Sequence, residues 1–350
     1  MKKRLLTLTL ALAMCLTLVL PAAAESGPDY SDIPEDHWSA DSVERATELG
    51  LFQGMGEGRF GRGEPISRAA FVTALVRLFD WEEVSPARPS FSDVTPDRWF
   101  YGAVETALAH DALATAEHAF RPTDNITREE MASMLVRGLG YTSLAAAVSD
   151  YDSPFGDIST NRGFIVIAYD LGIVDGVDEE RFNPGGSATR EQAAAMLVRV
   201  YDLLNEEMEE LSELGSYRLV AVTTPEAQEG DELPTTPLEP LTDLYDALLR
   251  LKNSDADMSR VALHLVAGGV RTVTSDGSLL GSEPLTAGQV EDVLEHPDVN
   301  VYYNDRYQSA YCTYQPNPYQ EAVVWYQSEE SMAAKLQLAQ LFGVNCYILE

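Results

Sequence analysis

Arginine recurs at one kind of position in the first part of the chain. Arg68, Arg128 and Arg190 each follow a Ser or Thr that opens an apolar helical pattern, and Ser and Thr are favoured helix N-caps. A cation in the first helical turn faces the positive end of the helix dipole, which costs a few tenths of a kcal/mol up to about 1 kcal/mol. Because a purely structural helix gains nothing from this placement, we interpret each arginine, together with free helix N–H groups, as a site for an anion.

Acidic residues in the same part of the chain offer an alternative partner for these arginines. Asp32, Asp93 and Asp157 follow an aromatic or small residue near the start of three similar segments, and each could pair with the arginine of a neighbouring segment. The two hypotheses are compatible. A second set of arginines lies nine residues further on, and at about 100° per residue this is the opposite side of the helix. We predict that this set is exposed or forms interface ion pairs; its members are Arg77, Arg137 and Arg199.

The three segments are copies of one repeat. Each begins with a motif of the form aromatic-x-Asp, and a tryptophan follows in the first two copies, Trp38 and Trp99, but not in the third. The next loop carries Gly54 in the first copy and Gly176 in the third, whereas the second copy has no glycine at 110–114. The repeat is therefore complete in order but uneven in its details.

Each copy closes with a second helix whose start is visible in the sequence. Thr127 with Glu130, and Thr189 with Gln192, have the spacing of a capping box. The first copy has Ala70 at the corresponding place and keeps half of the box. Apolar residues follow at helical spacing, so we expect the buried faces of the three helices to pack together.

The order aromatic-x-Asp, Trp, Gly-x-x-x-Gly, Phe, Pro and Ser/Thr-Arg-x-Glu resembles the S-layer homology domain, in tandem copies at 28–82, 89–141 and 153–203. The resemblance implies a mainly α pseudo-threefold bundle, with grooves between repeats that bind anionic, typically pyruvylated, secondary cell-wall polysaccharide. The uneven details predict unequal grooves. The candidate ligand-binding residues are Arg68, Arg128, Arg190, Asp32, Asp93, Asp157, Trp38, Trp99, Gly54 and Gly176.

The segment after the repeats has a different pattern. Residues 202–215 predict an acidic helix that ends at a glycine, 216–223 a strand, and 224–240 a linker rich in Pro, Glu, Thr and Gly. The remainder, 241–350, predicts a smaller α/β module. Its expected helices are 241–251, 286–295 and 331–341, and its expected strands are 260–266, 299–303, 310–314, 322–326 and 344–349.

The end of the chain resembles the closing part of the barrel of family 18 glycoside hydrolases, over about 240–350. The resemblance is carried by Val324-Trp325-Tyr326, by Ser331 and Lys335, and by the terminal strand. The acidic octet Asp-x-x-Asp-x-Asp-x-Glu of such enzymes is missing from the sequence, and Tyr347 stands where the family commonly has tryptophan. The segment is also too short for a closed barrel, which takes at least about 200 residues.

We therefore predict a partial, barrel-like module without catalytic activity. It would pack on itself, on the repeats, or on a partner that supplies the missing strands, because an unpaired sheet edge invites association. Self-association through this module is one consequence.

The N-terminal sequence and the net charge of the chain narrow the range of possible functions further. A basic start, an apolar run at 5–20 and three alanines at 22–24 predict a signal peptide over 1–24; a retained membrane anchor is the alternative. The formal net charge of −32 argues against a nucleic-acid ligand. Only four basic residues are lysine, so the positive charge is mostly arginine, which binds carboxylates with two hydrogen bonds.

Other chemistry is sparse, and we predict no metal and no cofactor. Cys312 and Cys346 form a disulfide or remain buried thiols. For the acidic residues at 175–179 there are two interpretations, a calcium-binding loop and a solvated acidic loop. Tyrosines crowded at 302–326 stack on a carbohydrate or pack between layers.

Together these features predict a secreted, non-enzymatic protein of the cell surface. Its repeats would anchor it non-covalently to a wall polysaccharide linked to peptidoglycan. The alternative is a glycan-binding or wall-acting glycoside hydrolase-like protein that acts through the C-terminal module.

Overall fold

A computed structural model describes residues 30–114, 118–206, 208–211, 218–222, 241–304 and 308–349. The expected signal peptide over 1–24 and the expected linker over 224–240 lie outside these residues. Within the described part of the chain, no helix is long and apolar enough to cross a membrane. The repeats form helices α1 (Ala40–Glu48), α2 (Arg68–Leu78), α3 (Tyr101–Ala109), α4 (Arg128–Gly138), α5 (Thr142–Ala147), α6 (Arg162–Asp170) and α7 (Arg190–Asn205).

The second helix of each repeat starts at the expected cap. The side-chain oxygens of Ser67, Thr127 and Thr189 each accept the N–H of the third helical residue. The capping box is complete where that third residue is Glu130 or Gln192. The first repeat, which has alanine there, keeps half of the box, as the sequence predicts.

The repeats close into a ring with pseudo-threefold symmetry. Helix α2 packs on α3, α4 on α6, and α7 on α1, so each second helix contacts the first helix of the next repeat. At the axis, the N–H of Ile66 donates to the carbonyl of Ala188 (3.1 Å), that of Ile126 to Ile66 (3.0 Å), and that of Ala188 to Ile126 (2.9 Å). These three residues are buried, and the bundle implied by the repeat pattern is confirmed.

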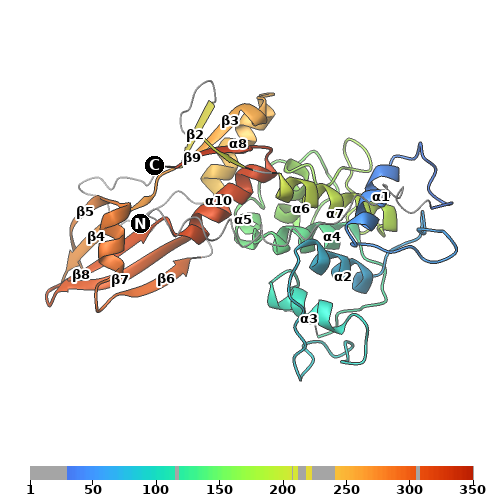
Figure 1. The fold of residues 1–350 in the computed structure, drawn as a ribbon, viewed down its shortest axis with the longest axis horizontal. Helices are drawn as coiled ribbons and strands as arrows, with labels where there is room; N and C mark the ends of the chain where they lie inside the picture. The colour runs from blue at the N-terminus through green and yellow to red at the C-terminus, as the bar shows by residue number, and fades with distance from the viewer. Residues whose placement is uncertain are drawn as a thin grey trace, which may run out of the picture.

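The C-terminal module contains two separate sheets (Figure 1). A parallel sheet has the order β1-β9-β3-β2, and an antiparallel sheet has the order β5-β4-β8-β7-β6. The whole chain is thus mixed α/β, and "mainly α" describes only the repeats. The parallel sheet also takes in β1 (Glu209–Glu210) and β2 (Arg218–Val222), which precede the expected start of the module at 241. The module's other elements are α8 (Leu241–Asn253), β3 (Val261–Leu265), β4 (Gly268–Ser275), β5 (Ser278–Thr286), α9 (Ala287–Leu294), β6 (Asn300–Asn304), β7 (Ser309–Asn317), β8 (Gln320–Tyr326), α10 (Glu329–Leu341) and β9 (Cys346–Leu349).

Two expectations for this part of the chain need correction. The acidic helix expected over 202–215 ends early, because α7 stops at Asn205 and Glu209–Glu210 pairs with β9 instead; residues 212–215 lie outside the described residues. The side-chain amide of Gln340 donates to the carbonyl of Leu204 (3.2 Å) at the end of α7. The β4–β5 hairpin was not expected at all, although Asp276 and Gly277 at its turn both have positive φ, as a two-residue hairpin turn requires.

The module packs on the third repeat and on the segment that joins the second repeat to it. Helix α10 contacts α7, and α8 contacts α5; Figure 1 shows α10 between the antiparallel sheet and the helical bundle. The hydroxyl of Tyr245 donates to Asp170 Oδ2 (2.5 Å), and that of Tyr151 donates to Asp246 Oδ1 (2.8 Å). One continuous apolar core joins the repeats to α8, β3 and α10, and a second core lies between the antiparallel sheet and α9. The module therefore packs both on the repeats and on itself, and packing on a partner stays a prediction.

Candidate ligand-binding grooves

Each arginine at the start of a second helix reaches into the next repeat. Its Nε donates to the carbonyl of a buried phenylalanine, and its guanidinium lies 4.6 to 5.0 Å from the centre of the same ring. The pairs are Arg68 with Phe120 (2.8 Å), Arg128 with Phe182 (2.8 Å) and Arg190 with Phe60 (2.9 Å). The structure therefore gives the three arginines equivalent positions between repeats.

The helix N–H groups beside these arginines are already occupied. The backbone N–H of Arg68 donates to Asp124 O (2.9 Å), that of Arg128 to Gly186 O (3.0 Å) and that of Arg190 to Glu64 O (3.0 Å). These bonds hold neighbouring repeats together. The hypothesis that free helix N–H groups help to bind an anion is therefore wrong for these donors, and the guanidinium side chains are the groups left to do it.

The three motif aspartates hold the loops of their own repeats. Asp93 accepts the N–H groups of Phe120 and Arg121, both at 2.7 Å. Asp32 and Asp157 accept the equivalent N–H groups in their repeats. Partial burial raises the pKa of Asp32 and Asp157, but these hydrogen bonds outweigh it and the pKa of each lies below its usual value.

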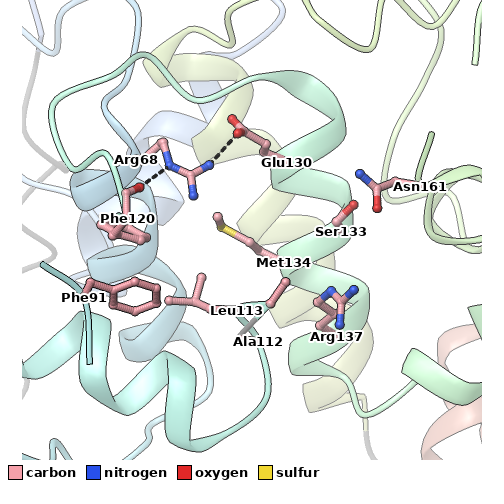
Figure 2. Close-up of a pocket in the computed structure, with 11 residues that line it drawn as sticks. Arg68, Phe91, Ala112, Leu113, Phe120, Glu130, Ser133, Met134, Arg137 and Asn161 are labelled. Atoms are coloured by element: carbon pink, nitrogen blue, oxygen red, sulfur yellow. Dashed lines mark hydrogen bonds and ion pairs between the residues drawn. The ribbon is translucent and has the colours of Figure 1, made fainter. Parts of the chain in front are cut away.

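The acid that pairs with Arg68 is Glu130, not one of the motif aspartates. Oε1 of Glu130 lies 2.6 Å from Nη1 of Arg68 (Figure 2). The same oxygen lies 2.9 Å from Nη2 of Arg121. Burial raises the pKa of Glu130, but the N–H of Thr127 and the charges of the two arginines outweigh burial, so its pKa lies below the usual value. Arg68 is only 6% exposed. The positive charge of Arg68 is thus balanced by a carboxylate of the protein itself.

The Arg68 groove, defined by Arg68, the 112–114 loop, Glu130 and Asn161, has a cavity of about 120 Å³. Figure 2 shows Arg68 with Glu130 on one side of this cavity, and Asn161 and Arg137 on the other. Three repeats contribute to it, because Asn161 comes from the third. The glycine-free loop of the second repeat and the tryptophan-free segment of the third therefore meet in one groove.

The Arg128 groove, defined by Arg128, the 173–176 loop, Gln192 and Trp38, has a cavity of about 170 Å³. Gln192 stands where Glu130 stands in the Arg68 groove, and Trp38 takes the place of Asn161. Trp38 is 60% exposed. Burial lowers the pKa of Arg128, and the charges of Asp175 and Asp157 oppose this. The cavity lining thus combines an exposed aromatic residue and a neutral amide with two arginines, Arg128 and Arg199, the second of which is paired with Asp175.

The third position of the ring belongs to Arg190. Its Nη2 donates to the carbonyl of Gln53 (3.0 Å), as Nη2 of Arg128 donates to the carbonyl of Asp175 (2.5 Å). By the same symmetry Ala70 holds the place of Gln192. Trp99, which is 69% exposed, holds the place of Trp38.

The loop glycines have a packing role. A Cβ at Gly54 would lie 2.7 Å from the ring of Tyr30, and one at Gly176 would lie 2.3 Å from Asp178 O. The left-handed residue after the first helix, Gly50 or Gly172, is replaced by Asp111 in the second repeat, with a φ of 56°. Asp111 is therefore the structural counterpart of Gly50 and Gly172, whereas the sequence pattern aligns the residue before it with them. With this alignment the counterpart of Gly54 in the second repeat lies outside the described residues.

The second arginines are held in different ways. Arg199 pairs with Asp175 Oδ2 at 2.8 Å, and Arg77 donates to the carbonyl of Leu51 (3.3 Å). Arg137 lies over the ring of Phe164, 4.4 Å from its centre. Arg77 and Arg199 are exposed, as expected, and Arg199 forms an ion pair within its own repeat, whereas Arg137 is half-buried against the ring of Phe164.

The C-terminal module carries an aromatic ladder, defined as Tyr302, Tyr311 and Trp325 on adjacent strands. The rings of Tyr302 and Tyr311 stack with centres 5.0 Å apart, and those of Tyr311 and Trp325 with centres 4.5 Å apart. Cys312 and Cys346 are both free and buried, so the expectation of buried thiols is confirmed.

Comparison with known proteins bears on the repeats. Residues 29–72, 90–132 and 154–194 match the family model of the S-layer homology domain. The chain carries three S-layer homology domains. An S-layer protein of Bacillus thuringiensis subsp. finitimus is 24% identical over 307 residues, which cover 85% of this chain and 37% of that protein. An amylopullulanase of Thermoanaerobacterium thermosulfurigenes is 30% identical over 189 residues, or 52% of this chain and 10% of that protein.

The chain thus spans well under half the length of these curated relatives. Among solved structures, the spore cortex-lytic enzyme SleL of Bacillus cereus has a TM-score of 0.32 at 11% identity, covering 65% of this chain and 60% of that chain. A chitinase of Chromobacterium violaceum has a TM-score of 0.28 at 13% identity, covering 64% and 70%. Likeness of this degree carries no conclusion about the module's fold or activity.

Proposed function

We propose that this protein is anchored non-covalently to the bacterial cell wall, and that its S-layer homology domains bind an acidic, pyruvylated secondary wall polysaccharide. The domains and the surface-layer relatives support a location at the cell surface or cell wall. The single observation that carries the proposal is the Arg128 groove. There the Arg128 guanidinium and the exposed Trp38 line one cavity together with the neutral Gln192, and the Asp175 carboxylate in its lining is paired with Arg199.

This combination fits a sugar that carries a carboxylate. A guanidinium binds a carboxylate through charge-assisted hydrogen bonds, and an aromatic face packs against the apolar face of a pyranose ring. The formal net charge of −32 repels an anionic polymer at long range, and salt screens that repulsion beyond about 8–10 Å. Binding therefore depends on short contacts made by individual arginines.

The experiment is co-sedimentation of the full chain with cell-wall sacculi before and after removal of their secondary polysaccharide. We expect retention on intact sacculi and loss of it on stripped sacculi. Arg128→Gln should weaken retention, whereas Arg45→Gln removes the same charge from an exposed pair with Glu48 and should not. Equal retention on both kinds of sacculi would refute the polysaccharide as the ligand.

A second candidate function rests on the aromatic ladder of the C-terminal module. Tyr302 is 46% exposed and continues a stack of rings across three strands, a form suited to packing against a glycan chain. We propose no catalytic role for it. This second function predicts that the Arg128→Gln variant is still retained on stripped sacculi. Adding Tyr302→Ala to that variant should abolish the retention.

A further inference from the structure

A larger cavity lies where the repeats meet the C-terminal module. We call it the junction cavity and define it by Trp81, His110, Arg137, Ser143 and Gln308. Trp81 follows α2, His110 follows α3, Arg137 lies in the last turn of α4, Ser143 lies in α5, and Gln308 directly precedes β7. The volume of the cavity is about 670 Å³, which is in the range of small-molecule sites. Its lining residues differ from those of the Arg128 groove.

One side of the junction cavity is aromatic. The rings of Phe79 and Trp81 stack with centres 4.7 Å apart, and those of Trp81 and His110 stack with centres 4.2 Å apart and planes inclined by 2°. A Cβ at Gly138 in α4 would lie 2.7 Å from the Phe79 ring, so the stack requires the glycine that the second repeat has there. His110 is exposed and ends the stack. It therefore offers a flat surface on which a sugar ring can pack.

Arg137 has hydrogen-bonding capacity that its counterparts in the other repeats have used. Arg77 and Arg199 each donate to a loop carbonyl of their own repeat, at 3.3 and 3.4 Å. Arg137 instead lies over the ring of Phe164, and its guanidinium has no hydrogen-bonding partner within the described residues. Its N–H groups are therefore available to a ligand in the junction cavity.

The charges in the junction cavity decide the kind of ligand that fits it. Asp111 also lines the cavity. Burial lowers the pKa of Arg137, and the charge of Asp111 opposes this. The side chains of Asp111, Thr142 and Ser143 likewise make no hydrogen bond within the part of the chain that the structure describes. A sugar hydroxyl accepts from a guanidinium and donates to a carboxylate, so a cation beside an anion favours a neutral, hydroxyl-rich ligand over a charged one.

We propose that the junction cavity binds a neutral sugar of a cell-wall glycan. The sugar ring packs on His110, and its hydroxyls bond to Arg137 and Asp111. Oε1 of Gln308 accepts the hydroxyl of Tyr303 (3.1 Å), which holds the module's side of the cavity in place. The site goes beyond the proposed function, because it takes an uncharged ligand at a different place. Since a neutral sugar forms no ion pair, the site adds to the anchoring contacts and does not by itself hold the chain on stripped sacculi.

The test uses the four tryptophans of the chain as separate reporters. Trp81 reports the junction cavity and Trp38 the Arg128 groove, while Trp99 and Trp325 lie elsewhere. The full chain with isotope-labelled tryptophan is titrated with the disaccharide of N-acetylglucosamine and, separately, with fragments of secondary wall polysaccharide freed of pyruvate. The indole N–H signals are followed by NMR. The Trp81 signal, assigned with Trp81→Phe, should shift and saturate.

Two variants test the residues that carry the proposal. His110→Ala removes the exposed ring and should weaken binding about three- to tenfold. Arg137→Gln removes the charged donor and should weaken it about ten- to a hundredfold. The matched controls His118→Ala and Arg45→Gln change exposed residues outside the cavity and should bind as the wild type does. The signals of the other three tryptophans in the ligand-free variants check that the fold is intact.

The outcomes also identify the source of the sugar. A shift with the disaccharide points to the glycan strand of peptidoglycan, and a shift with the polysaccharide fragments alone points to the secondary polymer; both support the proposal. If neither probe moves the Trp81 signal, or if both variants bind as the wild type does, the proposal is wrong. The proposed function is tested independently, because a pyruvylated probe should move the Trp38 signal whatever happens at Trp81.

Discussion

The carboxylate of Glu130 lies 2.6 Å from the guanidinium of Arg68 and joins two successive repeats. The pair shows that each groove is built from residues of more than one repeat. The arginine comes from one repeat, the loop and second helix from the next, and the residue opposite from the remaining one. Sequence changes in different repeats therefore act on a common groove.

The Glu130 pair predicts a loss of stability in acid. Because its pKa in the folded protein lies below the ordinary 4.5, its contribution is fully present above that value and is lost as the pH falls through the folded pKa. The difference in free energy of unfolding between the wild type and E130Q should therefore shrink as the pH drops from 7 to below 4. Urea denaturation at several pH values measures this difference, and one that stays constant would contradict it.

The motif aspartates are predicted to act on stability. Asp93→Ala removes an acceptor that holds two backbone N–H groups of the 120–121 turn. A lost hydrogen bond to a charged group costs about 1.5–3 kcal/mol, and we expect a loss in this range in urea denaturation. The exposed Asp36→Ala is the control and should stay within about 0.5 kcal/mol of the wild type. A stable Asp93→Ala protein with weakened glycan binding would instead favour a direct role in the site.

Buried Lys335 predicts a second rise of stability with pH, in the alkaline range. The residue is 1% exposed, its ammonium donates to Gln327 Oε1 at 2.8 Å, and burial lowers its pKa from 10.5 to about 8. Between these values the unfolded chain binds more protons than the folded one, so stability rises with pH. The free energy of unfolding of the wild type minus that of Lys335→Met should increase from pH 8 to 10.5. A flat difference would mean that the lysine is not desolvated.

The junction between the repeats and the module predicts a single unfolding transition. Tyr245 is fully buried, and its hydroxyl donates to Asp170 across this junction. Burial raises the pKa of Asp170, and the hydroxyl and Lys252 oppose this. Tyr245→Phe should cost about 1–3 kcal/mol and lower one common melting temperature. Two separate transitions by calorimetry would show that the repeats and the module unfold independently.

Local signals in the sequence predict most of the repeat architecture. The caps at Thr127 and Thr189 and the periodicity behind them depend on residues within one turn, so the helices begin where expected. The partner of Arg68 could not be predicted, because Glu130 reaches it only when the ring closes.

The C-terminal module shows the same limit. The helix expected after Asn205 gives way to a strand, because its partner β9 lies at the far end of the sequence. The β4–β5 hairpin carried a local signal, the Asp276-Gly277 dipeptide, which is the strongest short-range indication of a hairpin turn. That strand pair was predictable from the sequence.

The central claim is that the Arg128 groove holds the carboxylate of a wall polysaccharide. The most direct measurement is equilibrium binding of the full chain to purified wall polysaccharide, compared with the same polymer after its pyruvate has been removed by mild acid. The account predicts binding to the first polymer that falls about ten- to a hundredfold in Arg128→Gln, with no change in Arg45→Gln. Equal affinity of the wild type for both polymers would contradict it.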